Sequence, residues 1–354
     1  MVFEGEYTHG GDIYKNHIRV DFSANVNPYG TPRAVREAVK RAAERIAVYP
    51  DPYCGPLRTK IAEMSGIARE DVICGNGAAE LIYQFALSLR PETALLPAPS
   101  FSDYEEALSA AGTKIRHHEL RRGEGFRLTD RILPEITPKT GVLILGNPNN
   151  PTGLTVERGL LRQILARCWN TGTWLFVDEC FMDLTDEEKA DTLLPELREG
   201  DRVFLLRAFT KTYGMAGVRL GYGISKNREL LRRMSGLSQS WNVSAIAQAA
   251  GLAALAETGW AEKARALFRK EKPYLVRALT KADLTVYPGD ANFLLFSGPA
   301  SLGKELLDRG ILIRDCRNYH GLSEGDFRIA VRTRRENRQL IGAIREIMDH
   351  GNGN

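Results

Sequence analysis

The sequence predicts an α/β protein: a large domain built on a mainly parallel sheet, joined to a smaller α+β domain. Short apolar runs alternate with longer helical patterns between residues 71 and 206. These runs are continuous rather than alternating, as in strands that are buried on both faces. The pattern changes after about residue 250, and a chain of 354 residues has room for two domains.

The large domain is predicted from the alternation of its elements. We expect strands at 71–74, 94–96, 142–145, 174–177 and 203–206, with helices at 78–89, 104–111 and 157–168 between them. Strands joined by helical crossovers run parallel, and a sheet of this kind binds its ligands at the carboxyl ends of the strands. The residues that follow each strand are therefore the first candidates for a functional site.

The C-terminal third reads as a smaller domain of mixed elements. We expect helices at 245–256, 261–279 and 301–308 and at the C-terminus, and strands at 284–286, 292–296, 311–314 and 327–331. A further helix at 32–46 precedes the large domain. We predict a large domain at 46–250 and a small domain formed by 1–45 and 251–354.

Composition excludes several classes of protein. The formal charge of +4 is small and the basic residues of the chain are scattered, which argues against a nucleic-acid partner. No apolar run approaches the ~20 residues needed to cross a bilayer. The five cysteines are far apart and form no CxxC pair, so we expect neither a disulfide framework nor a metal site. We expect a cytoplasmic protein.

Lys211 lies in the most informative segment of the chain, Arg207–Gly214. It follows the apolar run 203–206, has small and hydroxyl residues around it, and precedes Arg219 by eight positions. This is the pattern expected of a lysine that forms a Schiff base with pyridoxal phosphate (PLP), with the arginine near the cofactor phosphate. The alternative is a solvated lysine at a strand end.

Two further segments follow predicted strands. Gly75–Glu80 places glycines before a helix N-terminus, where free N–H groups suit a phosphate; the alternative is a simple tight turn. In Asn147–Gly153 two prolines fix the backbone, so Asn150 can project an amide into a site; the alternative is a rigid surface turn.

Two single residues at the ends of predicted strands are further candidates for the site. Asp178 can hold a pyridine nitrogen protonated by a charge-assisted hydrogen bond, or it can cap a loop. Phe101 can stack on a cofactor ring, or it can pack in the core.

Together these motifs resemble the fold type I PLP enzymes of the class I/II aminotransferase superfamily, over almost the whole chain. The resemblance implies a seven-stranded type of sheet and a homodimer with shared active sites. It implies that Lys211 is the Schiff-base lysine, Asp178 the partner of the pyridine nitrogen and Asn150 that of the ring hydroxyl oxygen. It assigns the phosphate to Arg219, Thr210 and the backbone of Gly77, Ala78 and Ala79.

The resemblance also assigns two more distant residues and exposes two departures. Tyr49 matches a tyrosine that reaches the cofactor phosphate of the neighbouring subunit, and Arg328 an arginine that holds the substrate carboxylate. Phe181 stands where many aminotransferases have a tyrosine, and Ala208 where a serine or threonine often binds phosphate. We expect the second departure to weaken phosphate binding by about 1 kcal/mol.

The subfamilies most similar to the chain are threonine-phosphate decarboxylase of the cobalamin pathway and histidinol-phosphate aminotransferase. Segments 9–11, 21–28, 239–245 and 314–322 resemble the decarboxylase. We therefore expect a small phosphorylated amino-acid substrate, threonine phosphate, held by His9, Asn25 and Arg314 besides Arg328. The alternatives are an aminotransferase acting with 2-oxoglutarate and, more remotely, a PLP-binding regulator without catalysis.

Overall fold

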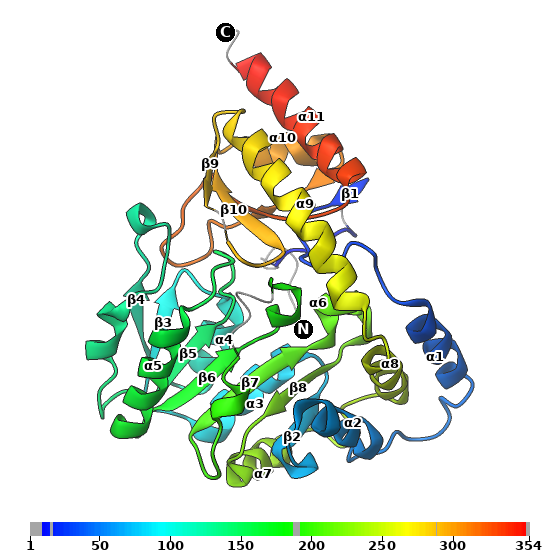
Figure 1. Cartoon of the computed structure of the whole chain (residues 1–354), viewed down its shortest axis with the longest axis vertical. Helices are drawn as coiled ribbons and strands as arrows, with labels where there is room; N and C mark the ends of the chain where they lie inside the picture. Colours follow the sequence, from blue (N-terminus) through cyan, green and yellow to red (C-terminus); the bar gives the residue numbers. More distant parts are fainter. Residues whose placement is uncertain (1–8, 15–16, 187–191, 288, 352–354) are drawn as a thin grey trace.

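The computed structural model describes residues 9–14, 17–186, 192–287 and 289–351. A wide lower lobe contains the large sheet, and a smaller upper lobe stands on it (Figure 1). In order across the large sheet, the seven strands are β2 (Val72–Gly75), β8 (Gly221–Ile224), β7 (Val203–Ala208), β6 (Trp174–Asp178), β5 (Val142–Gly146), β3 (Thr93–Ala98) and β4 (Lys114–Glu119). The predicted class, an α/β protein with a mainly parallel sheet, is confirmed.

Strand direction in this sheet brings the predicted motifs together. The pairs β3–β4, β3–β5, β5–β6 and β6–β7 are parallel, whereas β8 is antiparallel to both β7 and β2. All strands except β8 therefore run the same way. The turns after β2, β3, β5, β6 and β7 consequently lie along one edge of the sheet.

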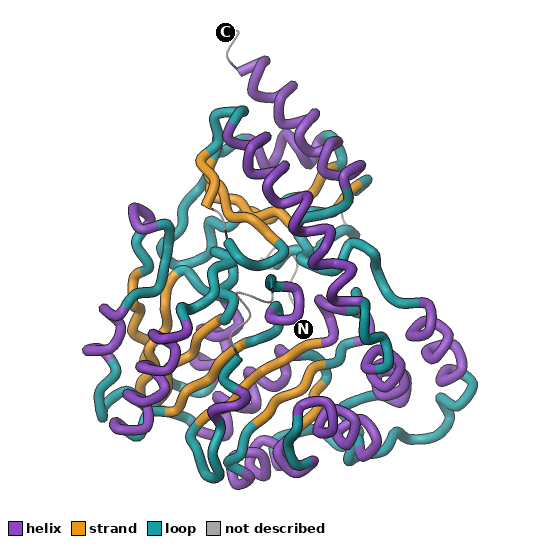
Figure 2. Tube along the Cα trace, viewed as in Figure 1, coloured by secondary structure: helices purple, strands orange, loops and turns teal. Residues whose placement is uncertain are grey.

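Helices cover both faces of the sheet, as the continuous apolar strands require (Figure 2). Val142 and Ile144 of β5 pack in one cluster with residues of α3 (Ala78–Leu89), α4 (Ser102–Ala110) and α7 (Arg228–Gly236). Leu143 and Leu145 point the other way, into a cluster with α5 (Arg158–Thr171).

The upper lobe is built on an antiparallel sheet. Its strands, in order, are β12 (Arg314–Asp315), β13 (Asp326–Ala330), β10 (Phe293–Ser297) and β9 (Thr285–Tyr287). The helices that pack on it are α9 (Trp260–Thr280), α10 (Leu302–Asp308) and α11 (Arg334–Gly351). The predicted strand 311–314 is wrong as a single element, because β11 (Ile311–Leu312) pairs with β1 (Val20–Asp21), whereas β12 pairs with β13.

The described residues among 9–45 contact both lobes. Strand β1 joins the upper lobe through β11, but α1 (Arg33–Ala43) packs on α8 (Ala245–Leu255). Val35 of α1 is fully buried in a cluster that also contains two residues of α8, Ala250 and Ala254. Leu57 of α2 (Gly55–Ser65) belongs to the same cluster. The division of the chain at residues 46 and 250 remains a prediction.

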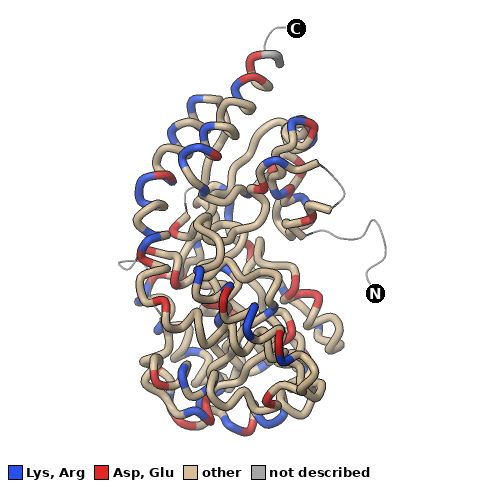
Figure 3. The backbone as a smooth tube through the Cα atoms, turned by 90° about the vertical axis from the view of Figure 1, so that its right-hand side faces the viewer, with Lys and Arg blue, Asp and Glu red and all other residues tan. Residues whose placement is uncertain are grey.

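The charged residues are scattered over the structure, as the sequence predicts. Basic and acidic residues are interspersed over both lobes in the side view (Figure 3). Within the described part of the chain, no helix is both long and apolar enough to span a membrane.

Candidate active site

A cavity of about 550 Å³ opens at the carboxyl ends of the parallel strands, where the two lobes meet. It brings together residues that are up to about 320 positions apart in the chain. Of the residues predicted from the sequence, those that line it are Lys211, Asp178, Asn150, Arg219, Thr210, Ala78, Ala79, Phe101, Arg328, Arg314, His9 and Asn25. Gly77 lies directly behind Arg219, and only Tyr49 lies elsewhere.

Lys211 belongs to α6 (Phe209–Thr212), one short turn that follows β7 directly. Burial, and after it the positive charge of Arg328, lowers the pKa of its ammonium group to about 8. At pH 7 roughly a tenth of such a lysine is neutral, against about 0.03% at an ordinary pKa. The sequence pattern therefore leads to an amine that is poised to act as a nucleophile.

Asp178 ends β6 and is fixed by two donors. The hydroxyl of Tyr104 donates to Oδ2 at 2.7 Å, and the backbone N–H of Cys180 donates to Oδ1 at 2.9 Å. Burial raises the pKa of Asp178 above its usual range, although these donors and Lys211 oppose the shift. A cationic ring nitrogen beside the carboxyl would restore its charge.

Arg219 lies over the start of α3. A Cβ at Gly77 would collide with its guanidinium, and one at Gly221 would come within 2.6 Å of the backbone nitrogen of Ala78. Gly77 also has a φ of +85°. The two glycines thus let an arginine and a helix N-terminus converge, and the first turn of α3 offers N–H groups without intrahelical partners. Thr210 is buried beside this corner of the cavity.

Arg314 and Arg328 face the cavity from paired positions on β12 and β13. Arg314 donates to Asn318 Oδ1 at 2.7 Å and to the carbonyl of Asp315 at 2.5 Å. Arg328 donates to the carbonyl of Ser23 at 2.8 Å and to Oδ1 of Asn150. Both arginines are over nine-tenths buried, and neither forms a salt bridge within the described residues.

Several buried polar atoms of the cavity lack partners among the described residues. They are Nδ2 and Oδ1 of Asn25, Nε of Arg328 and Oδ1 of Asp103. Buried polar groups are nearly always hydrogen-bonded, so these atoms are placed for a ligand. A ring with a basic nitrogen, a phosphate and an aldehyde would meet Asp178, the Arg219 corner and Lys211 respectively, so the residues present fit PLP.

Phe101 and His9 form the outer wall of the cavity. The ring of His9 tilts over Phe101 with centroids 5.9 Å apart, and Phe101 meets Tyr104 edge-on at 5.6 Å. His9 is therefore in the cavity, although its N-terminal position gave little reason to expect order.

Tyr49 does not line the cavity of its own chain. Tyr49 is 73% exposed, and its ring stacks on that of Trp241, with centroids 4.2 Å apart and ring planes at 20°. This placement is compatible with a role in a neighbouring subunit and excludes a role in its own site.

The two departures from the common pattern also lie in the cavity. Phe181 is buried against Phe293, with the amine of Lys211 at 5.5 Å from its ring centroid. Ala208 has no polar side-chain atom to contribute to the wall.

The sequence reasoning gave no individual role to several residues that line the cavity, among them Tyr104, Asp103 and Ser23. Tyr104 was placed in a helix without a role, Asp103 was not considered, and Ser23 was named only as part of a segment. A usable signal existed for Tyr104 and Asp103, because both lie in the first turn of α4, directly after β3 and Phe101.

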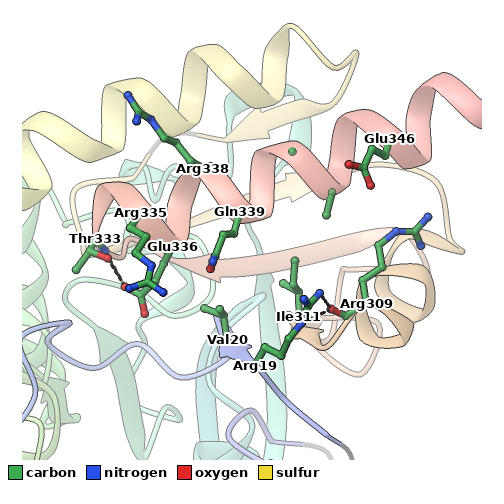
Figure 4. Close-up of a pocket in the computed structure, with 12 residues that line it drawn as sticks. Arg19, Val20, Arg309, Ile311, Thr333, Arg335, Glu336, Arg338, Gln339 and Glu346 are labelled. Carbon is green, nitrogen blue, oxygen red and sulfur yellow. Dashed lines mark hydrogen bonds between the residues drawn. The ribbon is translucent and has the colours of Figure 1, made fainter.

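Another cavity lies between α11 and the β1–β11 pair and shares no lining residue with the first. It is lined mainly by charged side chains, among them Arg19, Arg309, Arg335 and Arg338 (Figure 4). None of the predicted site residues belongs to it, so the candidate site is the cavity at the strand ends.

Known proteins resemble the chain over nearly its full length. Residues 17–344 match the family of class I and II aminotransferases. The threonine-phosphate decarboxylase of Salmonella typhimurium is 37% identical over 93% of this chain and 91% of its own. The histidinol-phosphate aminotransferase of Bacillus velezensis is 32% identical, over 93% and 91%.

A solved structure supports the same assignment. The histidinol-phosphate aminotransferase of Clostridium acetobutylicum superposes with a TM-score of 0.87 and 26% identity, over 94% of this chain and 99% of its own. The chain therefore belongs to the class I and II aminotransferase family and is a PLP-dependent enzyme, a decarboxylase or an aminotransferase.

Proposed function

We propose that this enzyme binds PLP at Lys211 and decarboxylates L-threonine O-3-phosphate to aminopropanol phosphate. The observation that carries the proposal is the pair of buried guanidiniums, Arg314 and Arg328, at facing positions of one cavity. Each is without an acidic partner among the described residues, so the cavity has room for two anionic groups. Threonine phosphate supplies two, a carboxylate and a phosphate.

Each anionic group has a matching set of donors. Arg328, with Asn25 beside it, suits the carboxylate, because a guanidinium binds a carboxylate through two parallel hydrogen bonds. Arg314, with His9 across the cavity, suits the phosphate. Fixing the substrate at both ends sets its orientation, which decides which bond at Cα breaks.

The remaining residues hold the cofactor and move a proton. Asp178 binds the ring nitrogen, Arg219 with Thr210 and the start of α3 binds the phosphate, and Phe101 covers the ring. PLP supplies an electron sink for the charge left at Cα after carbon dioxide departs. Lys211, whose pKa of about 8 lets it exchange protons near neutrality, returns a proton to Cα.

We further propose a homodimer in which Tyr49 serves the cofactor of the partner. Tyr49 and Trp241 lie in a region of exposed apolar side chains that also includes Ile46, Val48 and Tyr53. Large exposed apolar patches mark interaction surfaces. The role in cobalamin biosynthesis rests on the name of a similar bifunctional protein of adenosylcobalamin biosynthesis from Leptospira interrogans.

The alternative is transamination of histidinol phosphate. That substrate has a phosphate but no carboxylate, so it would use only one of the two arginines. Its acceptor, 2-oxoglutarate, has two carboxylates and would fit both, so an assay has to separate the activities.

The test gives the purified enzyme with PLP two substrates in parallel. With threonine phosphate we expect release of carbon dioxide and one equivalent of a phosphorylated amine. With histidinol phosphate and 2-oxoglutarate we expect no glutamate. Glutamate formation without carbon dioxide release would overturn the proposal.

A further inference from the structure

Asp103 is an acid in the wall of the active-site cavity to which the proposed function gives no role. It lies in the first turn of α4, and its side chain is only 13% exposed. Its Oδ1 is buried without a hydrogen-bond partner among the described residues and lies 3.4 Å from Nε2 of His9. A buried carboxyl in a phosphate-binding cavity requires an explanation, because its charge opposes that of the ligand.

The surroundings of Asp103 are rich in negative charge. Glu106 faces it from the same helix and Asp178 from the end of β6, whereas Lys211 is the cation that opposes them. Burial and these two acids raise the pKa of Asp103 to about 7. Tyr104 on α4 and Tyr83 on α3 also lie within reach of its charge, and both are neutral in this range.

His9 faces the opposite kind of charge. Burial lowers the pKa of its imidazole, Glu106 raises it, and Arg314 and Arg328 lower it again. Near neutral pH, His9 is therefore mainly uncharged and Asp103 is divided between its two forms. A phosphate that enters this corner is attracted by Arg314 and repelled by ionised Asp103.

We propose that Asp103 is a positioning residue that takes up a proton when a phosphorylated amino acid binds and releases it when the ligand leaves. The proton comes from solvent and goes to the carboxylate, so the corner changes from repelling to accepting the phosphate. The neutral acid also provides an O–H donor beside His9. The inference rests on the proposed function, because that function places the substrate phosphate in this corner.

Steady-state kinetics between pH 6 and 8.5 test the proposal in the PLP-loaded enzyme. For the wild type, the KM for threonine phosphate should rise with pH through about 7, by up to tenfold per unit. Asp103→Asn imitates the neutral acid, so its KM should keep the low-pH value across this pH range. The second ionisation of the substrate phosphate, near pH ~6, is common to both enzymes and cancels in the comparison.

Glu106→Gln is the matched control. It removes a neighbouring carboxylate but leaves Asp103 free to titrate. Because Glu106 raises the pKa of Asp103, the rise in KM should persist in this variant and move to lower pH. A uniform increase of KM at every pH in Asp103→Asn would show a merely structural role and overturn the proposal.

Calorimetry separates this proposal from the proposed function. Binding of aminopropanol phosphate, measured in two buffers of different ionisation enthalpy, should take up about half a proton more at pH 7 in wild type than in Asp103→Asn. Equal uptake would overturn the role of Asp103. Absence of carbon dioxide release by the wild type would count against the proposed function alone.

A control experiment tests whether a metal ion, rather than a proton, acts at Asp103. Ligand atoms of His9, Asp103 and Glu106 lie within 4.8 Å of one another, close enough to share an ion. The kinetics are therefore repeated with EDTA and with added Mg²⁺, and we expect no change. A KM that depends on Mg²⁺ in the wild type and not in Asp103→Asn would replace the proton with a metal ion and overturn the proposal.

Discussion

Lys211 acquires its chemistry from burial more than from any single neighbour. The removal of water is the largest cause of its lowered pKa, and the cations Arg328 and Arg219 add to it. The sequence indicated this lysine as a candidate, because it showed the strand end and the following arginine. It could not show the degree of burial, which depends on the upper lobe closing over the strand ends.

The first prediction concerns the pH dependence of cofactor uptake. A folded-state pKa lowered to about 8 means that the neutral, nucleophilic amine grows as pH rises through 8. The rate at which the apoenzyme binds PLP, followed by visible absorbance, should rise up to about pH 8 and then level off. A rate that continues to rise toward pH 10 would contradict the lowered pKa, and Lys211→Ala should show no covalent absorbance at all.

The second prediction concerns Tyr104, whose hydroxyl donates to Asp178. Tyr104→Phe removes a hydrogen bond to a charged group, worth about 1.5–3 kcal/mol, so PLP should bind roughly ten- to a hundredfold more weakly. Tyr83→Phe is the control, because that hydroxyl reaches only Glu106 at 3.5 Å and lies outside the cavity. PLP affinity is measured by equilibrium titration. Equal affinity in both variants would show that the Tyr104 hydroxyl does not support PLP binding.

At the scale of elements, the sequence predicted the strands of the large sheet whose apolar runs are continuous and gave no range for the other two strands of that sheet. The strand β8, with the sequence Gly-Tyr-Gly-Ile, is short and half glycine, so its composition gives no strand signal. The strand β4, from Lys114 to Glu119, lies at the sheet edge and is mostly polar. Both form because neighbouring strands supply their hydrogen bonds, which is tertiary information that a local pattern does not contain.

The turn before α3 gives the third prediction. Gly77 has a φ of +85°, which alanine rarely adopts, and the Cβ added in Gly77→Ala would collide with the guanidinium of Arg219. The substitution should therefore displace that arginine and weaken PLP binding. Gly112→Ala is the matched control: its φ of +77° is similar, but an added Cβ meets nothing within 4 Å. Both variants should lose about 1 kcal/mol of stability, but only Gly77→Ala should lose PLP affinity. Similar PLP affinities in the two variants would contradict the phosphate site.

For the whole molecule, the site could be predicted only as a list of residues. Strand order places the turns after β3, β5, β6 and β7 along one edge, so their convergence followed from the fold class. The fold class did not predict that His9, Arg314 and Arg328 contribute to the site. Their contribution depends on how the upper lobe and the N-terminal segment meet the sheet. The resemblance to a known family supplied these residues where physical reasoning from local pattern could not.

The fourth prediction tests shared active sites in a homodimer. Lys211→Ala and Tyr49→Ala should each be severely impaired alone. After mixing and subunit exchange, half of the dimers are hybrids with one intact site each, so activity should recover to about a quarter of wild type. No recovery, in a mixture shown by mass to contain hybrids, would mean that Tyr49 does not serve the partner's site.

The central claim is that the enzyme breaks the bond from Cα to the carboxylate rather than the bond from Cα to hydrogen. Threonine phosphate labelled with deuterium at Cα tests this directly, with the product analysed by mass spectrometry. We predict that the aminopropanol phosphate retains the deuterium and that unreacted substrate loses none. Loss of the label to solvent, with no carbon dioxide released, would contradict the account and identify an aminotransferase.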